Sequence, residues 1–565
     1  MKKNLKLTSL CLIFCLLLLT AMSVNLNGQI ISVQQQESAI KLIEEFNNEN
    51  TPGGAVIVMR DGKIVFQKAF GMANLTHNIP FQLNTPTNIG STSKQFTAFG
   101  IALLQERGLL SVEDDIRKHI PELPDLGETV RIRHLLSHTS GYREYINSLL
   151  MSGRQMGDMI RIEEIIPMVQ NQPALQNIPG ESYNYNNTGY ALLAMVIERV
   201  TGESYPDWMK KNIFQPLGMN QTVARAHPGQ IIPGNAQGYL EIEENTFREA
   251  MDIPASMGAG GIYSTIPDLE RWVQNFYNPT LGDAHLIKKL QTPFILNDGD
   301  TMNYAYGLII GDYQGLKLVE HGGADIAHRS MFMMFPEVKG AVITQSNNSS
   351  FSSQISRQLA DIFFTDVMIK EDEKKPVDPD EFVYDVEKFD ELAGRFELEA
   401  APGFILEFRR EEDKLFTQAT GQPAVELFAS SDSTFYLKVV EASVTFHRNE
   451  DGKVDHITLH QNGNHRANRL LEPAWEPSEE DIKMYQGRYF SVELEAFYTV
   501  AVNEEGGLVL QHRRIDDLPL KAESKDEFTA TFPIPQLKFL RDENGVVTGF
   551  EASSGRSTGI VFEKQ

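Results

Sequence analysis

The sequence predicts an α+β domain followed by two small all-β domains. First, strand-like segments lie at both ends of residues 37–366 and enclose several helical segments. Second, residues 370–380 form a charged, proline-bearing stretch that is typical of a linker. Third, the chain beyond this stretch consists of short alternating apolar and polar runs that repeat. The length of 565 residues agrees with about three domains.

Residues 55–66 carry the clearest local signal in the first domain. Two apolar runs flank Asp61-Gly62, a dipeptide that favours a tight hairpin turn. Helical segments follow at residues 96–108 and 189–200. Strand-like segments return at residues 257–265 and 307–346. We expect strands from the two ends of this domain to share one sheet.

The segment after residue 380 is an internal repeat. Gly394-Arg395-Phe396 recurs as Gly487-Arg488-Tyr489, which is 93 residues later (487 minus 394). The same offset relates six further pairs: Leu415 and Leu508, Phe435 and Phe528, Phe446 and Phe539, Arg448 and Arg541, Gly452 and Gly545, and Val454 and Val547. Two copies of an all-β unit of this size fit two small sandwiches or up-and-down barrels. We expect domains at residues 29–369, 381–472 and 473–565.

Residues 1–28 are predicted to be a secretory signal peptide. Three lysines precede an apolar run at residues 10–19, which is too short to span a membrane. We therefore expect a secreted or periplasmic protein without a membrane span in its mature chain. Both cysteines, Cys11 and Cys15, lie inside this leader. The mature chain would then have no disulfide, no thiol nucleophile and no cysteine-based zinc site.

The segment Gly90-Ser91-Thr92-Ser93-Lys94 is the first candidate for chemistry. It precedes an apolar helical run, which places Ser91 near a helix N-terminus and Lys94 one turn further on the same face. A serine hydroxyl needs a base to become a nucleophile, and a desolvated lysine can serve as one. This spacing predicts Ser91 as nucleophile, although a Ser-x-x-Lys pattern alone also occurs by chance.

Two further motifs supply partners for Ser91. Tyr185-Asn186-Asn187 precedes a helical run, and Tyr185 could transfer a proton if a neighbouring cation such as Lys94 lowered its pKa. Asn187 could bind a substrate carbonyl while contacting Lys94. His321-Gly322-Gly323-Ala324 ends a strand-like run, where glycines such as Gly323 let a ligand approach the backbone. The N–H groups of Ser91 and Ala324 would then form an oxyanion hole.

In this order, Ser-x-x-Lys, Tyr-x-Asn and His-x-Gly resemble the motifs of the penicillin-recognising serine hydrolases. The most similar branch is that of class C β-lactamase-like enzymes, which includes D,D-peptidases, D-aminopeptidases and family VIII esterases. Residues 132–141 and 257–265 also resemble family stretches, and the resemblance covers about residues 35–365. It implies an antiparallel sheet flanked by helices, and the D-aminopeptidases of the family add two C-terminal lipocalin-like barrels. In that family a barrel loop can reach the active site.

The resemblance assigns a role to each motif residue. Ser91 is the acylated nucleophile, Lys94 activates it and Tyr185 carries the proton. Asn187, His321 and Gly323 bind the substrate. His321 stands where β-lactamases have the lysine of Lys-Thr-Gly, so either a cationic or a hydrogen-bonding role is expected for it.

These observations predict a secreted serine hydrolase that acts through an acyl-enzyme on small amides or peptides. A carboxylesterase or β-lactamase of the same family is the alternative, and a non-catalytic penicillin- or peptide-binding protein is the alternative of another class. We expect no metal or other cofactor and a small-molecule or peptide substrate. The formal charge of −25, without any basic block, argues against nucleic acid or an anionic membrane as a partner. The sequence leaves the oligomeric state open.

Two other patterns are predicted to be structural. Gly555-Arg556-Ser557-Thr558-Gly559 matches the G-x-S-x-G nucleophile elbow, but no histidine follows it, so we expect a hairpin turn of the second repeat. His134 and His138 are four residues apart without the glutamate of a His-Glu-x-x-His zinc motif. We expect them to pack and to form hydrogen bonds rather than to bind metal.

Overall fold

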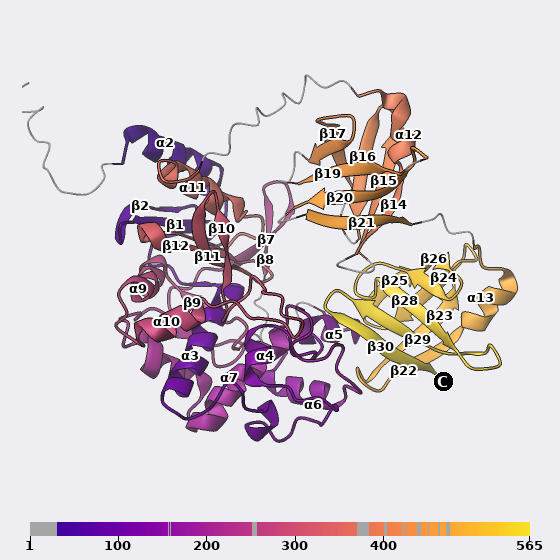
Figure 1. Cartoon of the computed structure of the whole chain (residues 1–565), viewed down its shortest axis with the longest axis horizontal. Helices are drawn as coiled ribbons and strands as arrows, with labels where there is room; N and C mark the ends of the chain where they lie inside the picture. Colours follow the sequence, from indigo (N-terminus) through magenta and orange to yellow (C-terminus); the bar gives the residue numbers. More distant parts are fainter. Residues whose placement is uncertain are drawn as a thin grey trace, which may run out of the picture.

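The computed structural model describes residues 31–155, 158, 160–250, 257–369, 384–399, 404–420, 422, 424–437, 442–449, 451–461, 464–470 and 475–565. The predicted leader at 1–28, with Cys11 and Cys15, and the predicted linker at 370–380 lie outside these residues. Figure 1 shows a first domain in indigo through magenta to dull red, an orange barrel and a yellow barrel. This architecture confirms the predicted fold class.

A six-stranded antiparallel sheet forms the centre of the first domain, in the order β10-β11-β12-β13-β1-β2. Its strands are β1 (Gly54–Arg60), β2 (Lys63–Phe70), β10 (Ile309–Tyr313), β11 (Leu316–Ala324), β12 (Arg329–Phe335) and β13 (Gly340–Ser346). β1 and β2 form the predicted hairpin around Asp61-Gly62, and β1 pairs with β13, with Ile57 opposite Ile343. Strands from both ends of the domain therefore share one sheet, as expected.

Helices cover both faces of this sheet. Val56 and Val58 of β1 face one core, where α2 (Val33–Leu42) and α11 (Gln354–Phe364) pack. Ile57 lies in the opposite core, because successive strand residues point to opposite faces. That second core contains the other helices that the structure describes in the first domain. They are α3 (Lys94–Glu106), α4 (Ile132–Leu136), α5 (Tyr145–Met151), α6 (Ile165–Gln170), α7 (Asn187–Thr201), α8 (Tyr205–Met209), α9 (Ile266–Tyr277) and α10 (Ala284–Leu290). Among them, α3 and α7 carry Lys94 and Asn187.

Short strands complete the first domain. They are β3 (Met72–Asn74), β4 (Ile79–Pro80), β5 (Thr87–Asn88), β6 (Val223–Ala224), β7 (Gly238–Glu243), β8 (Thr246–Ala250) and β9 (Ile262–Ser264). β5 and β9 pair immediately before the turn that carries Ser91, so this small sheet fixes the start of that turn.

The two repeats form two β-barrels. The first is closed and comprises α12 (Phe389–Leu392), β14 (Gly394–Leu398), β15 (Ile405–Glu411), β16 (Lys414–Ala419), β17 (Val425–Ala429), β18 (Thr434–Leu437), β19 (Ser443–Arg448), β20 (Val454–His460) and β21 (Asn464–Leu470). The second comprises α13 (Glu479–Tyr485), β22 (Gly487–Ser491), β23 (Ala496–Val502), β24 (Leu508–His512), β25 (Ile515–Pro519), β26 (Lys521–Ser524), β27 (Glu527–Thr529), β28 (Gln536–Arg541), β29 (Val547–Ser554) and β30 (Ser557–Lys564). Its nine-stranded sheet is nearly closed, with β25 and β26 at its edges.

Equivalent hydrogen bonds in the two barrels agree with the 93-residue repeat. In the first barrel the Arg448 guanidinium donates to the carbonyl oxygen of Gly452 at 2.8 Å. In the second, Arg541 donates to Gly545 at 2.6 Å. Each arginine thus closes the turn of its own hairpin, which explains why both members of the pair recur at the same offset.

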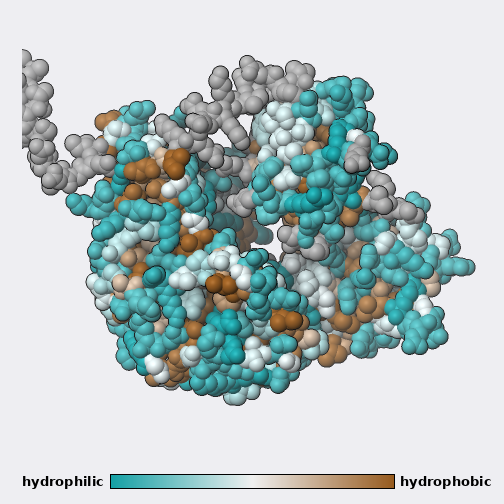
Figure 2. Space-filling model, in the orientation of Figure 1, coloured by the Kyte–Doolittle hydropathy of each residue, from teal (hydrophilic) through white to brown (hydrophobic). Residues whose placement is uncertain are grey.

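The second barrel packs against the first domain through α5, as Figure 1 shows. Met151 at the end of α5 is buried in the apolar core of the barrel, and the Tyr498 hydroxyl donates to its carbonyl oxygen at 2.9 Å. Hydrophilic residues cover most of the face in Figure 2. Among the described residues, the helices are all too short or too polar to cross a bilayer.

Candidate active site

The predicted nucleophile lies on a tight turn at the start of a helix. The 3-10 turn η2 (Gly90–Ser93) leads directly into α3, so Ser91 and Lys94 lie one turn apart, as the spacing predicts. Gly90 has a φ of 51°, and a Cβ there would lie 2.6 Å from the backbone nitrogen of Ala324. Glycine therefore allows the turn to lie against the end of β11.

The Lys94 side chain is completely buried and reaches three oxygen atoms. Its Nζ lies 3.1 Å from Ser91 Oγ, 2.7 Å from Asn187 Oδ1 and 2.8 Å from the carbonyl oxygen of Ala259. Asn187 comes from the second motif, and Ala259 from the glycine-rich segment 257–265. The structure thus brings the first two motifs together around one amine.

The surroundings of Lys94 favour its neutral form. Burial lowers the pKa of Lys94 well below its usual value, and the positive charge of Arg556 lowers it further. The Glu144 carboxylate opposes this shift. A neutral amine beside a serine hydroxyl can accept the hydroxyl proton, so this geometry can activate Ser91.

Asn187 is held between Lys94 and a buried carboxylate. α7 begins at this residue, and the preceding Asn186 caps the helix by accepting from the N–H of Gly189 at 2.9 Å. Asn187 Nδ2 donates to Glu144 Oε1 at 2.9 Å, which keeps its Oδ1 directed at Lys94. Glu144 therefore fixes the orientation of the amide.

Tyr185 lies above the same amine, but its acidity differs from the prediction. Its ring centroid is 4.7 Å from Lys94 Nζ, and the His138 ring lies 4.2 Å from it. Burial raises the pKa of Tyr185 above its usual value, and the hydrogen bond to Ser91 and the charge of Arg556 do not outweigh this effect. The condition stated for Tyr185, a pKa lowered by a cation such as Lys94, is not met, because burial dominates. The hydroxyl is a neutral proton donor.

His321 on β11 is a neutral hydrogen-bonding group. It is 3% exposed, and burial lowers its pKa to about 3, with a smaller contribution from Lys94. Its Nδ1 donates to the carbonyl oxygen of Gly322 at 2.7 Å, and its Nε2 accepts from the Tyr304 hydroxyl at 3.1 Å. Of the two expected roles, the cationic one is therefore disfavoured.

The end of β11 is joined tightly to the nucleophile turn. A Cβ at Gly323 would lie 2.0 Å from the carbonyl oxygen of Ile89, which only glycine avoids. Ser330 Oγ donates to that same oxygen at 2.8 Å and shares a 2.8 Å hydrogen bond with Thr92 Oγ1. These contacts place Ala324 beside the turn that carries the predicted nucleophile.

Ser93 has a different environment from Ser91. Its side chain is fully buried, and its Oγ accepts from the N–H of Ile262 at 3.3 Å. Ser91 is partly exposed and contacts Lys94. Ser93 therefore supports the turn, while the Ser91 hydroxyl is the one that a substrate can reach.

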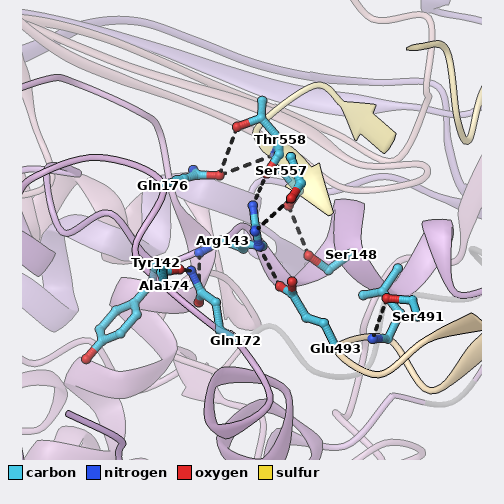
Figure 3. A network of polar contacts seen from close by, with 12 residues as sticks. Tyr142, Arg143, Ser148, Gln172, Ala174, Gln176, Ser491, Glu493, Ser557 and Thr558 are labelled. Carbon is cyan, nitrogen blue, oxygen red and sulfur yellow. Dashed lines mark hydrogen bonds and ion pairs between the residues drawn. The ribbon is translucent and has the colours of Figure 1, made fainter. Parts of the chain in front are cut away.

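A hairpin of the second barrel reaches this site. β29 and β30 meet at Gly555 and Arg556, so the G-x-S-x-G segment is a hairpin turn, as predicted. The carbonyl oxygen of Arg556 accepts from Gln176 Nε2 at 3.0 Å, across a separation of 380 residues, and from Asn184 Nδ2 at 3.1 Å. Figure 3 shows the neighbouring contacts, with Arg143 of the first domain directed at the Ser557–Thr558 strand.

His134 and His138 have hydrogen-bonding and packing roles. His134 Nδ1 accepts from the N–H of Arg131 at 3.2 Å, and burial lowers its pKa to about 3. His138 Nδ1 accepts from the N–H of Asn186 at 3.0 Å, and its ring packs among tyrosines. Both observations agree with the predicted structural roles.

Sequence reasoning missed two residues of this site. Glu144 follows the stretch 132–141, and the only available signal was a charged pair, Arg143-Glu144, between tyrosines. Arg556 was expected in a hairpin turn, and whether a barrel loop reaches the groups around Ser91 was left open. Neither position has a local pattern that indicates chemistry.

A family profile described as "Beta-lactamase" matches residues 39–361. The chain belongs to the β-lactamase family. The matched segment contains all seven predicted site residues, from Ser91 to Ala324. A second profile, "Domain of unknown function (DUF3471)", matches residues 384–476 of this β-lactamase-family protein, which hold the first barrel.

This β-lactamase-family protein is similar to penicillin-binding proteins and D-aminopeptidases. It is 28% identical over 443 residues to penicillin-binding protein 4* of Bacillus subtilis (strain 168), covering 75% of this chain and 96% of the relative. It is 27% identical to the D-aminopeptidase of Gluconobacter oxydans (strain 621H), covering 54% of this chain and 58% of the relative. The alignment thus spans under two thirds of that enzyme's length.

Solved structures agree with the fold of this β-lactamase-family protein. The octameric penicillin-binding protein homologue from Pyrococcus abyssi superposes with a TM-score of 0.55 at 24% identity, covering 77% of this chain and 99% of that one. Penicillin-binding protein from Bacillus halodurans gives a TM-score of 0.50 at 26% identity, covering 57% and 96%. The protein is a serine hydrolase of the β-lactamase family.

Proposed function

We propose that the protein hydrolyses small amides or peptides, with a D-amino acid on the acyl side, through an acyl-enzyme on Ser91. One observation carries this proposal: the buried Nζ of Lys94 lies 3.1 Å from Ser91 Oγ, and the pKa of Lys94 is lowered. The preference for D-amino acid amides rests on the similarity to D-aminopeptidases, such as those of Gluconobacter oxydans and Brucella anthropi.

The acylation step uses the contacts around Lys94. Ser91 Oγ attacks the carbonyl carbon, and its proton passes to the neutral amine of Lys94. The backbone N–H groups of Ser91 and Ala324 hold the oxyanion, and each such donor contributes about 3 kcal/mol in comparable sites. The neutral Tyr185 hydroxyl, which lies near Ser91, gives its proton to the departing nitrogen as the C–N bond breaks. Lys94 returns the proton that it accepted to Tyr185.

Deacylation reverses these roles. Water adds to the acyl carbon and gives one proton to the neutral amine of Lys94. The bond between the acyl carbon and Ser91 Oγ then breaks, and Tyr185 gives its proton to Ser91 Oγ while Lys94 passes the proton from water to Tyr185. Asn187 and Gly323 line the path of the substrate in this proposal. His321 contributes hydrogen bonding through its neighbours rather than charge, since it stays neutral above a pH of about 3.

The first experiment is covalent labelling with a fluorophosphonate probe, followed by turnover assays. Ser91→Ala should abolish labelling and turnover, while Ser93→Ala is the matched control within the same motif and should retain labelling. If Ser91→Ala keeps the activity of the unmodified protein, the proposed mechanism is wrong. Absence of labelling in folded protein would instead support a non-catalytic binding role.

The second experiment identifies the substrate class. D-alanine p-nitroanilide, a p-nitrophenyl ester and nitrocefin are assayed side by side under one set of conditions. We expect the highest kcat/KM for the D-alanine anilide. A clear preference for the ester or for nitrocefin would instead identify an esterase or a β-lactamase. Secretion through residues 1–28 is part of the proposal, and N-terminal sequencing of protein from the producing cells tests it.

A further inference from the structure

The hairpin between β29 and β30 is fixed rigidly against the first domain. The hydroxyl of Ser557 is fully buried, where it donates to the carbonyl oxygen of Glu144 at 2.9 Å and shares a 3.0 Å hydrogen bond with Ser148. Arg143 donates to the carbonyl oxygens of Thr558 and Gly559. Backbone and side-chain hydrogen bonds on both sides of the turn thus determine where Arg556 lies.

The guanidinium of Arg556 lies beside the proposed proton donor. Its Cζ is 4.7 Å from the centroid of the Tyr185 ring, the same distance as Lys94 Nζ. The arginine is exposed, so its planar group is accessible to a ligand that enters the site. Within the part of the chain that the structure describes, no carboxylate lies within ion-pairing distance of it. Arg556 therefore presents unneutralised charge to the site.

Three other basic side chains that the structure describes near the motifs are less available to bind an anion. Lys94 is buried and hydrogen-bonded to Asn187, and His321 is neutral. Arg329, which pairs with Ala324 in the sheet, donates to the backbone carbonyl oxygens of Asp325 and His328. Arg556 of the second barrel is thus the group best placed to recognise an anion on the substrate.

We propose that Arg556 is a specificity-determining residue that binds a carboxylate on the leaving group of the substrate. An arginine guanidinium binds a carboxylate through two parallel hydrogen bonds, a geometry that lysine does not reproduce. The carboxylate is assigned to the leaving group because of where Arg556 lies. Tyr185 gives its proton to the departing nitrogen, and Arg556 lies over that tyrosine. A carboxylate next to the departing nitrogen is that of a C-terminal amino acid. The favoured substrates are therefore short peptides with a free C-terminus.

The inference rests on the proposed function, and a matched pair of substrates tests it. D-alanyl-glycine and D-alanyl-glycinamide differ only in the C-terminal group, which is a charged carboxylate in the first and a neutral amide in the second. Both are assayed with the full chain and with Arg556→Gln, Arg556→Lys and, as control, Arg466→Gln, an exposed arginine of the first barrel. Because the charge of Arg556 also affects the pKa of Lys94, each enzyme is compared at the plateau of its own pH profile.

The expected result is a change in selectivity. Arg556→Gln should lower the ratio of kcat/KM for the acid to that for the amide by about 10- to 100-fold, mainly through KM. Arg556→Lys should restore part of this ratio, and Arg466→Gln should leave it unchanged. An equal loss on both substrates, or no change in the ratio, would overturn the inference.

Fluorophosphonate labelling separates this outcome from failure of the proposed function. If every Arg556 variant labels at Ser91 and hydrolyses both dipeptides with an unchanged ratio, only the inference about Arg556 fails. If the unmodified protein neither labels nor hydrolyses either dipeptide, the proposed function fails first.

Discussion

Arg143 Nε lies 2.5 Å from Glu493 Oε1, and each side chain is only 7% exposed. Arg143 belongs to the first domain and Glu493 to the second barrel, so this buried ion pair joins the two (Figure 3). The same guanidinium also binds the backbone of β30. One arginine therefore connects the barrel at two points next to the active-site hairpin.

We expect Glu493→Gln to loosen this junction, because removal of one partner leaves a buried charge unpaired, at a cost of about 3–5 kcal/mol. The melting temperature should fall, and the hairpin should lose its fixed position. Hydrogen exchange of residues 547–564 measures this directly. Glu495→Gln, two residues along the same segment and more exposed, is the control. Equal protection in both variants would contradict a role for the ion pair in docking.

Two neighbouring glycines provide a test of the junction between β11 and the nucleophile turn. At Gly323 a Cβ would lie 2.0 Å from Ile89 O, whereas at Gly322 the nearest atom is Met331 Sδ at 3.5 Å. Gly323→Ala should therefore lower the free energy of unfolding by about 1–3 kcal/mol. Gly322→Ala should change it little. Denaturant unfolding of the two variants makes the comparison, and equal effects would show that the close approach is unimportant.

Removal of the proposed base should affect the chemical step. Lys94→Met keeps an unbranched side chain in the buried site but cannot accept a proton. We expect kcat to fall by about 100- to 10,000-fold, with a smaller change in KM. Tyr185→Phe should lower kcat as well, since the leaving nitrogen loses its proton donor. Steady-state kinetics on D-alanine p-nitroanilide measures both, and a change confined to KM would argue for a binding role.

The pH dependence of activity should follow the charges around Lys94. The base must be neutral, so kcat/KM should rise as pH rises through the lowered pKa of Lys94. Arg556→Gln removes a charge that lowers this pKa, so this limb of the profile should move to higher pH. Glu144→Gln removes a charge that raises it, so the limb should move to lower pH. Shifts in the same direction for both variants would contradict the assignment of Lys94 as base.

His321 should influence acid stability rather than activity near neutral pH. Its pKa is about 3 in the folded protein, whereas an unfolded histidine titrates near 6.5. Between these values only the unfolded state gains the proton, so stability should fall as pH falls, by about 1.4 kcal/mol per pH unit for this residue. His321→Asn should reduce that slope. Imidazole resonances of His321 that titrate between pH 5 and 8 would contradict the buried neutral form.

Local patterns in the sequence predicted much of this fold. The Asp61-Gly62 hairpin, the Ser91 turn before α3 and the 93-residue repeat each depend on residues close in sequence or on recurrence. Such features follow from turn chemistry and periodicity, which act over a few residues. They can therefore be recognised from the order of the amino acids alone.

The other features of the site could not be predicted, because they depend on burial and on contacts between residues far apart in the sequence. The direction of the pKa shift of Tyr185 could not be predicted, because it depends on how many groups enclose the ring, which the spacing of the motif does not reveal. Glu144 acquires its role only through its hydrogen bond to Asn187. Arg556 reaches the site because a whole barrel docks against α5, and no local motif encodes that docking.

The hairpin that carries Arg556 also has a consequence for biosynthesis. A ribosome makes Ser91, Lys94 and β11 long before the second barrel, because chains grow from the N-terminus. The nascent first domain can therefore assemble the proposed catalytic groups while the hairpin is still missing. Arg556 reaches this position only when the second barrel folds and docks, so under the proposed roles the new chain would hold its nucleophile before the arginine that sets its selectivity.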